Sequence, residues 1–280
     1  MSDVAIIGAG ELGGALAHLL ARRNVVRAIR LVDATGRIAA GKALDIAQAG
    51  AVEGHATEVE GSTDVMAAAG AEIVVMADRA GKGDQQGEDP LALVKSVIQA
   101  SPNAIIVCAG SSHLDLVDRG VVELRIPRTR IFGSAPEAMV AAARALVALE
   151  VDGSPGDVAL TLLGVPPSHI VIPWEDATIG GLGAAQVIAE PHRRRIAAKV
   201  QALWPPGPYA LAAAAVHVID ALCGGSRRRS TCFVAPDRSA GVRTRTAALP
   251  VRLGPDGIQA VLLPELNPGD RVALENAMTL

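Results

Sequence analysis

The hydrophobic positions in the first half of the chain follow two alternating patterns. Short continuous apolar runs are typical of buried strands, and they lie at Val4–Ile7, Ile29–Val32, Ile73–Met76 and Ala104–Cys108. The segments between them repeat apolar residues at helical spacing, as at 12–20, 38–49 and 91–98. Strands that alternate with helices in this way predict a parallel sheet covered by helices on both faces.

The pattern changes after about Phe132, where longer, alanine-rich helical stretches and proline pairs appear. Predicted helices lie at 138–150, 192–203, 209–222 and 268–277, and predicted strands lie at 159–163, 230–234 and 244–251. The sequence Gly254-Pro255-Asp256-Gly257 predicts a turn between apolar runs. We therefore expect a doubly wound α/β domain over residues 1–133 and an α+β domain over residues 134–280.

Composition and charge limit the kinds of partner. Hydrophobic residues make up 50% and charged residues 20% of the chain, which is typical of an ordinary globular protein. The net charge of −3 and the aromatic content of 2% argue against nucleic acid, which needs a basic face or stacking side chains. No apolar run approaches the roughly 18 residues needed to span a bilayer, so we expect no membrane association.

Cysteine usage indicates a reducing compartment. Cys108, Cys223 and Cys232 are odd in number, and their spacing fits neither a disulfide framework nor a metal site. The first residues also lack the basic segment and the cleavage site of a signal peptide. We therefore expect a cytoplasmic protein without a bound metal.

A glycine-rich turn joins the first predicted strand to the first predicted helix. The segment Gly8-Ala9-Gly10-Glu11-Leu12-Gly13 fits the pattern G-x-G-x-x-G, and Asp33 ends the next strand 20 residues after Gly13. In this context the first glycine permits the turn, the second lets backbone approach a pyrophosphate, and the third lets the helix pack on the sheet. The alternative is a glycine turn that only packs the helix.

This turn predicts a Rossmann domain that binds a dinucleotide. The helix N-terminus would offer N–H groups to the phosphates. Asp33 would accept hydrogen bonds from the adenosine ribose and repel a 2′-phosphate, which favours NAD over NADP. The predicted cofactor-binding residues are Gly8, Gly10, Glu11, Leu12, Gly13 and Asp33.

These motifs resemble the opening of the NAD-dependent malate and lactate dehydrogenases. The likeness continues at Gly41-Lys42-Ala43-Leu44-Asp45 and Ser101-Pro102-Asn103-Ala104-Ile105-Ile106-Val107, and again at Leu249-Pro250-Val251 and Asp256-Gly257-Ile258. It covers nearly the whole chain and is weaker in the second domain. The resemblance implies a malate/lactate dehydrogenase fold, NAD as cofactor, hydride transfer to or from a 2-hydroxy acid, and a homodimer or homotetramer.

The residues that carry this chemistry in the family are replaced. Hydride transfer needs a histidine that moves the hydroxyl proton, an aspartate that orients it, and arginines that hold the substrate carboxylate. At the aligned positions, Pro166 stands in place of the histidine, Met139 in place of the aspartate and Ala142 in place of a substrate arginine. Glu88 stands in place of a second arginine, and Gly110 in place of an asparagine. The family's glycine that lets the cofactor pass falls near Arg79. Proline and methionine have no proton to exchange at neutral pH.

Three other side chains are candidates for a rebuilt catalytic site. His169 lies three residues after Pro166, His113 follows the strand at 104–108, and Lys82 lies near the position of the first loop arginine. Each histidine also has a structural alternative. His169 would then stand at the start of a strand, and His113 at the entry to a helix.

Two functional hypotheses follow. Loss of the histidine, aspartate, arginines and asparagine together favours a non-catalytic relative that binds NAD or another adenine nucleotide. The intact glycine turn favours an active NAD-dependent oxidoreductase with a rebuilt site and an unknown 2-hydroxy or 2-oxo acid-like substrate. A titratable side chain in the nicotinamide pocket would support the second hypothesis, and a pocket filled by Arg79, Pro166 or Met139 would support the first.

Overall fold

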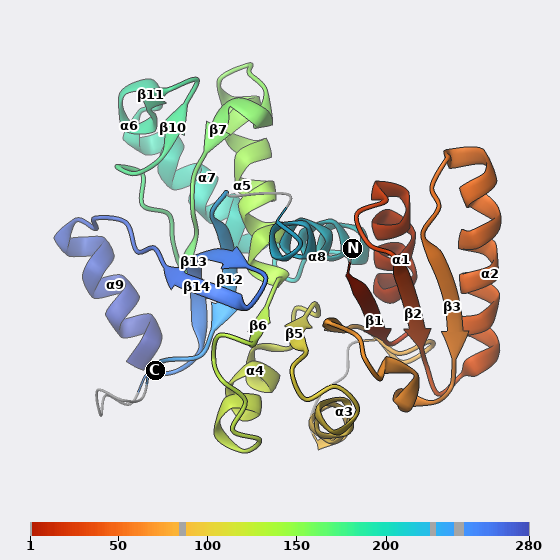
Figure 1. The fold of residues 1–280 in the computed structure, drawn as a ribbon. Coiled ribbons are helices and arrows are strands. Elements are labelled where there is room, and N and C mark those ends of the chain that lie inside the picture. The colour runs from red at the N-terminus through yellow and green to blue at the C-terminus, as the bar shows by residue number, and fades with distance from the viewer. Residues whose placement is uncertain (1, 84–87, 225–227, 238–243, 280) are drawn as a thin grey trace.

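One sheet runs through the molecule, and helices pack against both of its faces (Figure 1). The computed structural model describes residues 2–83, 88–224, 228–237 and 244–279. The strands of the first half are β1 (Asp3–Ile7), β2 (Ala28–Val32), β3 (Glu58–Ser62), β4 (Ile73–Met76), β5 (Ile105–Cys108) and β6 (Ile131–Gly133). They pair in the order β3-β2-β1-β4-β5-β6, and each of these pairings is parallel.

Both faces of the central strands of this parallel sheet are buried. Val4 and Ile6 of β1 belong to one apolar core, whereas Ala5 and Ile7 belong to another on the opposite face. Successive side chains of a strand point to opposite faces, which is why strands buried on both sides are continuous apolar runs in the sequence. The first core includes α1 (Glu11–Arg23) and α2 (Gly36–Glu53), and the second includes η1 (Val65–Ala68), α3 (Glu88–Ala100) and α4 (Leu114–Val122).

The second half extends the same sheet with antiparallel strands. They follow β6 in the order β12 (Ser230–Val234), β13 (Ala247–Gly254), β8 (Leu163–Val165) and β9 (His169–Val171), with β14 (Gly257–Val261) also paired to β13. A separate small sheet contains β7 (Val158–Ala159), β10 (Thr178–Ile179) and β11 (Leu182–Gly183). The main sheet therefore connects the two halves of the chain through β6 and β12.

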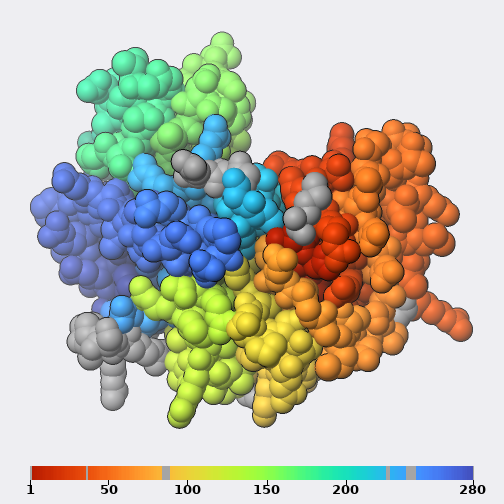
Figure 2. All heavy atoms as spheres, in the orientation of Figure 1, coloured from red at the N-terminus to blue at the C-terminus, as the bar shows by residue number. Residues whose placement is uncertain are grey.

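Helices of the second half cover this extension. They are α5 (Ala135–Glu150), η2 (Pro155–Asp157), α6 (Ala184–Val187), α7 (Glu190–Ala202), α8 (Pro208–Leu222) and α9 (Pro268–Thr279). α8 packs against both α1 and α5, so the first core continues from β1 into the second half. Figure 2 shows the green part of the chain, which includes the small sheet, standing out from the rest of this face.

The predicted fold class and most predicted elements are confirmed. The apolar runs at 73–76 and 230–234 coincide with β4 and β12. The prediction of one strand over 159–163 was wrong, because this segment is divided between β7 and β8, which belong to different sheets. The strand predicted at 244–251 runs instead from Ala247 to Gly254, because it continues to the turn before β14.

The pairing of the strands changes from parallel to antiparallel between β6 and β12. We propose that this change, at Gly133, separates a domain of residues 1–133 from a domain of residues 134–280. None of the helices in the described ranges is long and apolar enough to cross a membrane.

Candidate nucleotide-binding and catalytic site

The chain turns sharply between β1 and α1. Gly8 has a φ of +116°, a conformation that residues with a side chain rarely adopt. A Cβ added to Gly13 would overlap with the Gly8 carbonyl oxygen, and a Cβ added to Gly8 would overlap with the Asp78 carbonyl oxygen. The glycines therefore let the strand, the turn and the helix approach more closely than any side chain would permit.

Asp33 follows β2 and closes one side of this turn. Its Oδ2 accepts hydrogen bonds from the backbone N–H groups of Ala9 (2.8 Å) and Ala80 (3.0 Å), and its Oδ1 accepts one from Thr35 (2.8 Å). Burial by itself raises the pKa of Asp33, but these hydrogen bonds outweigh burial and lower the pKa below its usual value. The buried carboxylate therefore places a fixed negative charge at the end of β2.

Asp78 follows β4 and closes the other side of the turn. The backbone N–H groups of Gly13 and Leu12 donate to its Oδ1 (2.9 Å) and its Oδ2 (3.1 Å). The N–H of Gly10 donates to the Asp78 main-chain oxygen (3.0 Å). A carboxylate that accepts the first N–H groups of a helix stabilises that helix, because these groups have no partner inside it. Asp78 therefore caps α1 from a distant segment of the chain.

Asp78 was not predicted from its place in the sequence. The family's glycine was expected near Arg79, one residue later, but the residue that packs against Gly10 is Asp78. Arg79 turns toward α3, where its Nη1 lies 3.5 Å from Oδ2 of Asp89. The signal available in the sequence was a carboxyl residue directly after a buried strand, because parallel strands end at one shared edge.

The open space on the Asp33 side of the turn is small. A cavity of about 70 Å³ lies beside Asp33, and it is lined in part by Gly8, Thr63, Arg79 and Leu93. Sites for small molecules typically enclose about 300–1,000 Å³. On the other side, Nζ of Lys42 donates a hydrogen bond to the Gly10 carbonyl oxygen (2.6 Å). The predicted cofactor residues are therefore brought together. Little open space lies beside Asp33, whereas a cavity of about 490 Å³ on the Lys42 side is lined in part by Glu11 and Gly14.

Pro166 lies directly after β8, where the resemblance places a catalytic histidine. Pro166 and Pro167 belong to the short turn from β8 to β9 and are joined by a cis peptide bond. Val165 pairs with His169 across this hairpin, so His169 is the first residue of β9. The structure thus gives His169 the strand-start position that was its structural alternative.

The helix expected to carry the aspartate and the arginine presents apolar side chains instead. Met139 of α5 is 1% exposed and belongs to a third apolar core. Ala142 lies three residues later on the same helix. A methyl group and a thioether can neither orient a histidine nor pair with a carboxylate.

The other two candidates lie in loops after neighbouring strands. His113 is completely buried, and its Nδ1 accepts a hydrogen bond from the backbone N–H of Gly110 (3.1 Å), which fixes the loop before α4. Lys82 is exposed in a tight turn in which the N–H of Arg79 donates to the Gly83 oxygen (2.9 Å). Glu88 begins α3. The structure thus places His113, Lys82 and His169 on three different segments of the chain.

A buried acidic side chain lies in the first turn of α5. Burial raises the pKa of Glu137 to about 7, although the backbone N–H of Thr231 donates to its Oε2 (2.7 Å) and Arg144 lies nearby. Nε2 of His217 lies 3.7 Å from Oε1 of Glu137. Burial also lowers the pKa of His217, so both groups favour their neutral forms. They line a cavity of about 360 Å³ together with Arg144, Thr161, Arg228 and Arg229.

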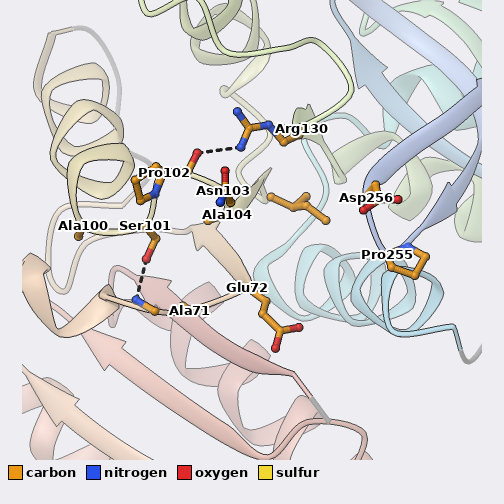
Figure 3. Close-up of a pocket in the computed structure, with 12 residues that line it drawn as sticks. Ala71, Glu72, Ala100, Ser101, Pro102, Asn103, Ala104, Arg130, Pro255 and Asp256 are labelled. Carbon is orange, nitrogen blue, oxygen red and sulfur yellow. Dashed lines mark hydrogen bonds between the residues drawn. The ribbon is translucent and has the colours of Figure 1, made fainter.

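Another cavity lies away from the glycine turn. It encloses about 580 Å³ at the amino ends of β4 and β5, between Glu72, Asn103 and Arg130 (Figure 3). Ligands of open parallel sheets bind beyond the carboxyl ends of the strands. Nη1 of Arg130 donates to the Pro102 oxygen (2.8 Å) in this cavity. Its position therefore does not support a role in nucleotide binding.

No group of three or more histidine, cysteine, aspartate or glutamate side chains in the described residues is placed to hold a metal ion.

Known proteins with similar sequences match nearly the whole of this chain. The profile of the lactate/malate dehydrogenase NAD-binding domain matches residues 2–116. A malate dehydrogenase of Chloroherpeton thalassium is 30% identical, with 97% of this chain and 94% of that relative covered. The chain belongs to the lactate/malate dehydrogenase family. Another member, the malate dehydrogenase of Thermomicrobium roseum, is 29% identical over 98% of this chain and 94% of its own.

Solved structures of lactate and malate dehydrogenases have the same fold. The malate dehydrogenase of Salinibacter ruber gives a TM-score of 0.86 at 24% identity, with 98% of this chain and 93% of that chain covered. The lactate dehydrogenase of Cryptosporidium parvum in complex with lactic acid and NAD gives a TM-score of 0.89 at 21% identity, with 99% and 94% covered. The lactate/malate dehydrogenase fold predicted from the motifs is therefore confirmed.

NAD is the cofactor of this lactate/malate dehydrogenase family member. Most residues of the glycine turn between β1 and α1 fit NAD. Gly8, Gly10 and Gly13 leave the backbone bare at the start of α1, and Asp33 stands at the end of β2. The Asp78 carboxylate does not fit, because it accepts the same N–H groups that the motif offers to a pyrophosphate.

Proposed function

We propose that this family member binds NAD but lacks the hydride-transfer chemistry of malate and lactate dehydrogenases. The observation that carries the proposal is Pro166, which stands directly after β8 in place of the histidine that moves the hydroxyl proton. Removal of a proton-transfer group typically lowers a rate by about 10²–10⁴-fold. Met139 and Ala142, which replace the orienting aspartate and a substrate arginine, support the same conclusion.

We also propose which residues bind the cofactor. Asp33 would accept hydrogen bonds from the adenosine ribose, and its ionised carboxylate would repel the 2′-phosphate of NADP. The N-terminus of α1 would face the pyrophosphate. The proposed set is Gly8, Gly10, Glu11, Leu12, Gly13 and Asp33.

A second candidate function is an NAD-dependent oxidoreductase with a rebuilt site. The intact glycine turn and the ionised Asp33 favour it, because a cofactor site without any use could have been lost. Its proton would come from His169 or Lys82, and its substrate would be a 2-hydroxy or 2-oxo acid. Complete burial of His113 makes that residue the least suitable of the three candidates.

The experiment that separates the two functions measures binding and turnover on one preparation. We expect calorimetric titration to show saturable binding of NAD and weaker binding of NADP. We expect no change in NADH absorbance with oxaloacetate or pyruvate, and none with malate or lactate in the presence of NAD. Turnover that disappears in the His169→Ala variant, while NAD binding remains, would establish the second function instead.

We further propose that the chain is a homo-oligomer. Leu44 and Val52 of α2 are 61% and 89% exposed, and Tyr209 at the start of α8 is 78% exposed. Lone exposed apolar residues are ordinary, but these three belong to helices that pack around α1. Light scattering is expected to give at least twice the chain mass of 28.6 kDa, and Leu44→Glu is expected to lower it. A wild-type mass of one chain would contradict the proposal.

The expected compartment is the cytoplasm. Cys108, Cys223 and Cys232 are unpaired in the structure, and Cys108 and Cys232 are buried. Thiols that are not joined in disulfides are typical of reducing compartments.

A further inference from the structure

Asp78 holds the donors that a dinucleotide would use at the start of α1. Its carboxylate accepts the N–H groups of Leu12 and Gly13 at 3.1 and 2.9 Å and is 7% exposed. The side chain lies directly against Gly10, because an ideal Cβ on Gly10 would overlap with the carboxylate. Gly10 is the glycine that leaves room for the pyrophosphate in this motif. In this structure the Asp78 side chain fills that room.

The carboxylate also resembles the ligand in its chemistry. A phosphate group and a carboxylate both present anionic oxygens to the N–H groups of a helix N-terminus, and both are stabilised by the helix dipole. The two anions cannot occupy the same donors, and like charges in close contact repel each other. A bound pyrophosphate therefore requires the Asp78 side chain to leave Leu12 and Gly13.

The segment after β4 is held in this position at two points. Asp78 binds the start of α1, and two residues later the N–H of Ala80 donates to Oδ2 of Asp33 (3.0 Å). Oδ2 of Asp33 also accepts from Ala9 in the turn. The cavity of about 70 Å³ beside Asp33 is correspondingly small. The two aspartates thus close the glycine turn from both sides.

We propose that Asp78 is an internal competitor of the NAD pyrophosphate, and that its displacement limits the affinity of this chain for dinucleotides. The proposal rests on the proposed function, since it assumes that NAD binds at the glycine turn. An apparent dissociation constant rises in proportion as the binding-competent fraction of a protein falls. Removal of the Asp78 carboxylate should therefore strengthen binding of every ligand that carries the pyrophosphate.

The test compares three ligands on the full chain and its variants by calorimetric titration. NAD and ADP-ribose contain the pyrophosphate, whereas adenosine does not. We expect Asp78→Gly to bind NAD and ADP-ribose at least about tenfold more tightly than the wild type, with adenosine changed less than about twofold. Asp78→Asn should give an intermediate gain, because its amide oxygen can still accept an N–H but carries no charge.

Two controls keep the outcome unambiguous. Asp115→Asn removes an exposed carboxylate in the first turn of α4 and should leave all three affinities unchanged. Without ligand, Asp78→Gly should melt at a lower temperature than the wild type because α1 loses its cap, and NAD should raise its melting temperature by a larger amount. If Asp78→Gly does not fold, the affinities of the wild type are compared with those of Asp78→Asn instead.

The possible failures differ from one another. If the wild type binds NAD and neither Asp78 variant binds it more tightly, the role of Asp78 is wrong and the proposed NAD binding stands. A similar gain for adenosine would also overturn the role, because adenosine does not reach Leu12 and Gly13. If neither the wild type nor any variant binds NAD, ADP-ribose or adenosine, both proposals fall together.

Discussion

Gly13→Ala is expected to lower the free energy of unfolding by about 3 kcal/mol or more. The added Cβ would overlap with the Gly8 carbonyl oxygen and lie 3.5 Å from the Cβ of Ala77. The Gly8 carbonyl oxygen is a backbone atom, and it cannot move away as the end of a flexible side chain can. Gly8 is itself held at a φ of +116°. The clash can be relieved only if α1 moves away from β1, which would open the core around Leu16 and Leu20.

Urea denaturation measures this effect, and Gly41→Ala is the matched control. Gly41 lies inside α2, and an added Cβ would have nothing within 4 Å. Alanine favours a helix interior over glycine by about 0.5–1 kcal/mol, so this control should be slightly more stable than the wild type. The same substitution is thus expected to have opposite signs at the two sites. Equal effects at both would mean that Gly13 is not packed against the turn.

Glu137→Gln is expected to stabilise the chain by about 3 kcal/mol at alkaline pH, with almost no effect near pH 4. The pKa of Glu137 is about 7 in the folded chain, above the ordinary glutamate value of 4.5, because burial disfavours the charged form. Below pH 4.5 both the folded and the unfolded chain hold the proton. As the pH rises toward 7 the unfolded chain releases it first, so the folded state loses relative stability. Glutamine stays neutral and avoids this loss.

The surroundings of Glu137 support the sign of this effect. His217, whose Nε2 lies 3.7 Å away, has a pKa lowered by burial and is therefore a weak cationic partner at alkaline pH. A glutamine oxygen can still accept the N–H of Thr231, so the substitution keeps that hydrogen bond. Urea denaturation at pH 4 and pH 8.5 measures the difference. The control is Glu190→Gln, at an exposed position of α7, and its effect should show no comparable dependence on pH. A gain in stability from Glu137→Gln that is equal at both pH values would refute the raised pKa of Glu137.

Local sequence determined the elements with strong periodicity. The strands β4 and β12 and the glycine turn between β1 and α1 could be predicted because their pattern lies within a few neighbouring residues. β3 was not predicted, because Glu58 and Glu60 interrupt its apolar pattern. Among the described residues, β3 is an edge strand and pairs only with β2. The hydrogen bonds to β2 stabilise β3 as a strand, and the local sequence pattern does not predict them.

The motifs in the sequence determined the family, and they carry the prediction that its usual catalytic groups are replaced. Pro166 and Met139 can be recognised from their positions alone, because no environment gives these side chains an exchangeable proton at neutral pH. The sequence likewise gives NAD as the expected cofactor through Gly8, Gly10, Gly13 and Asp33. The prediction for Pro166 and Met139 depends only on residue type, whereas the affinity for NAD also depends on a neighbour in space, Asp78.

Tertiary structure alone decided what surrounds those residues. Asp78 is more than sixty residues from Leu12 and Gly13 along the chain, and only the pairing of β4 with β1 brings its carboxylate to their N–H groups. The burial of His113 and the raised pKa of Glu137 also depend on distant segments that exclude water. Hydrogen bonds and desolvation are set by distance in space, and they therefore become visible only when the fold places these segments together.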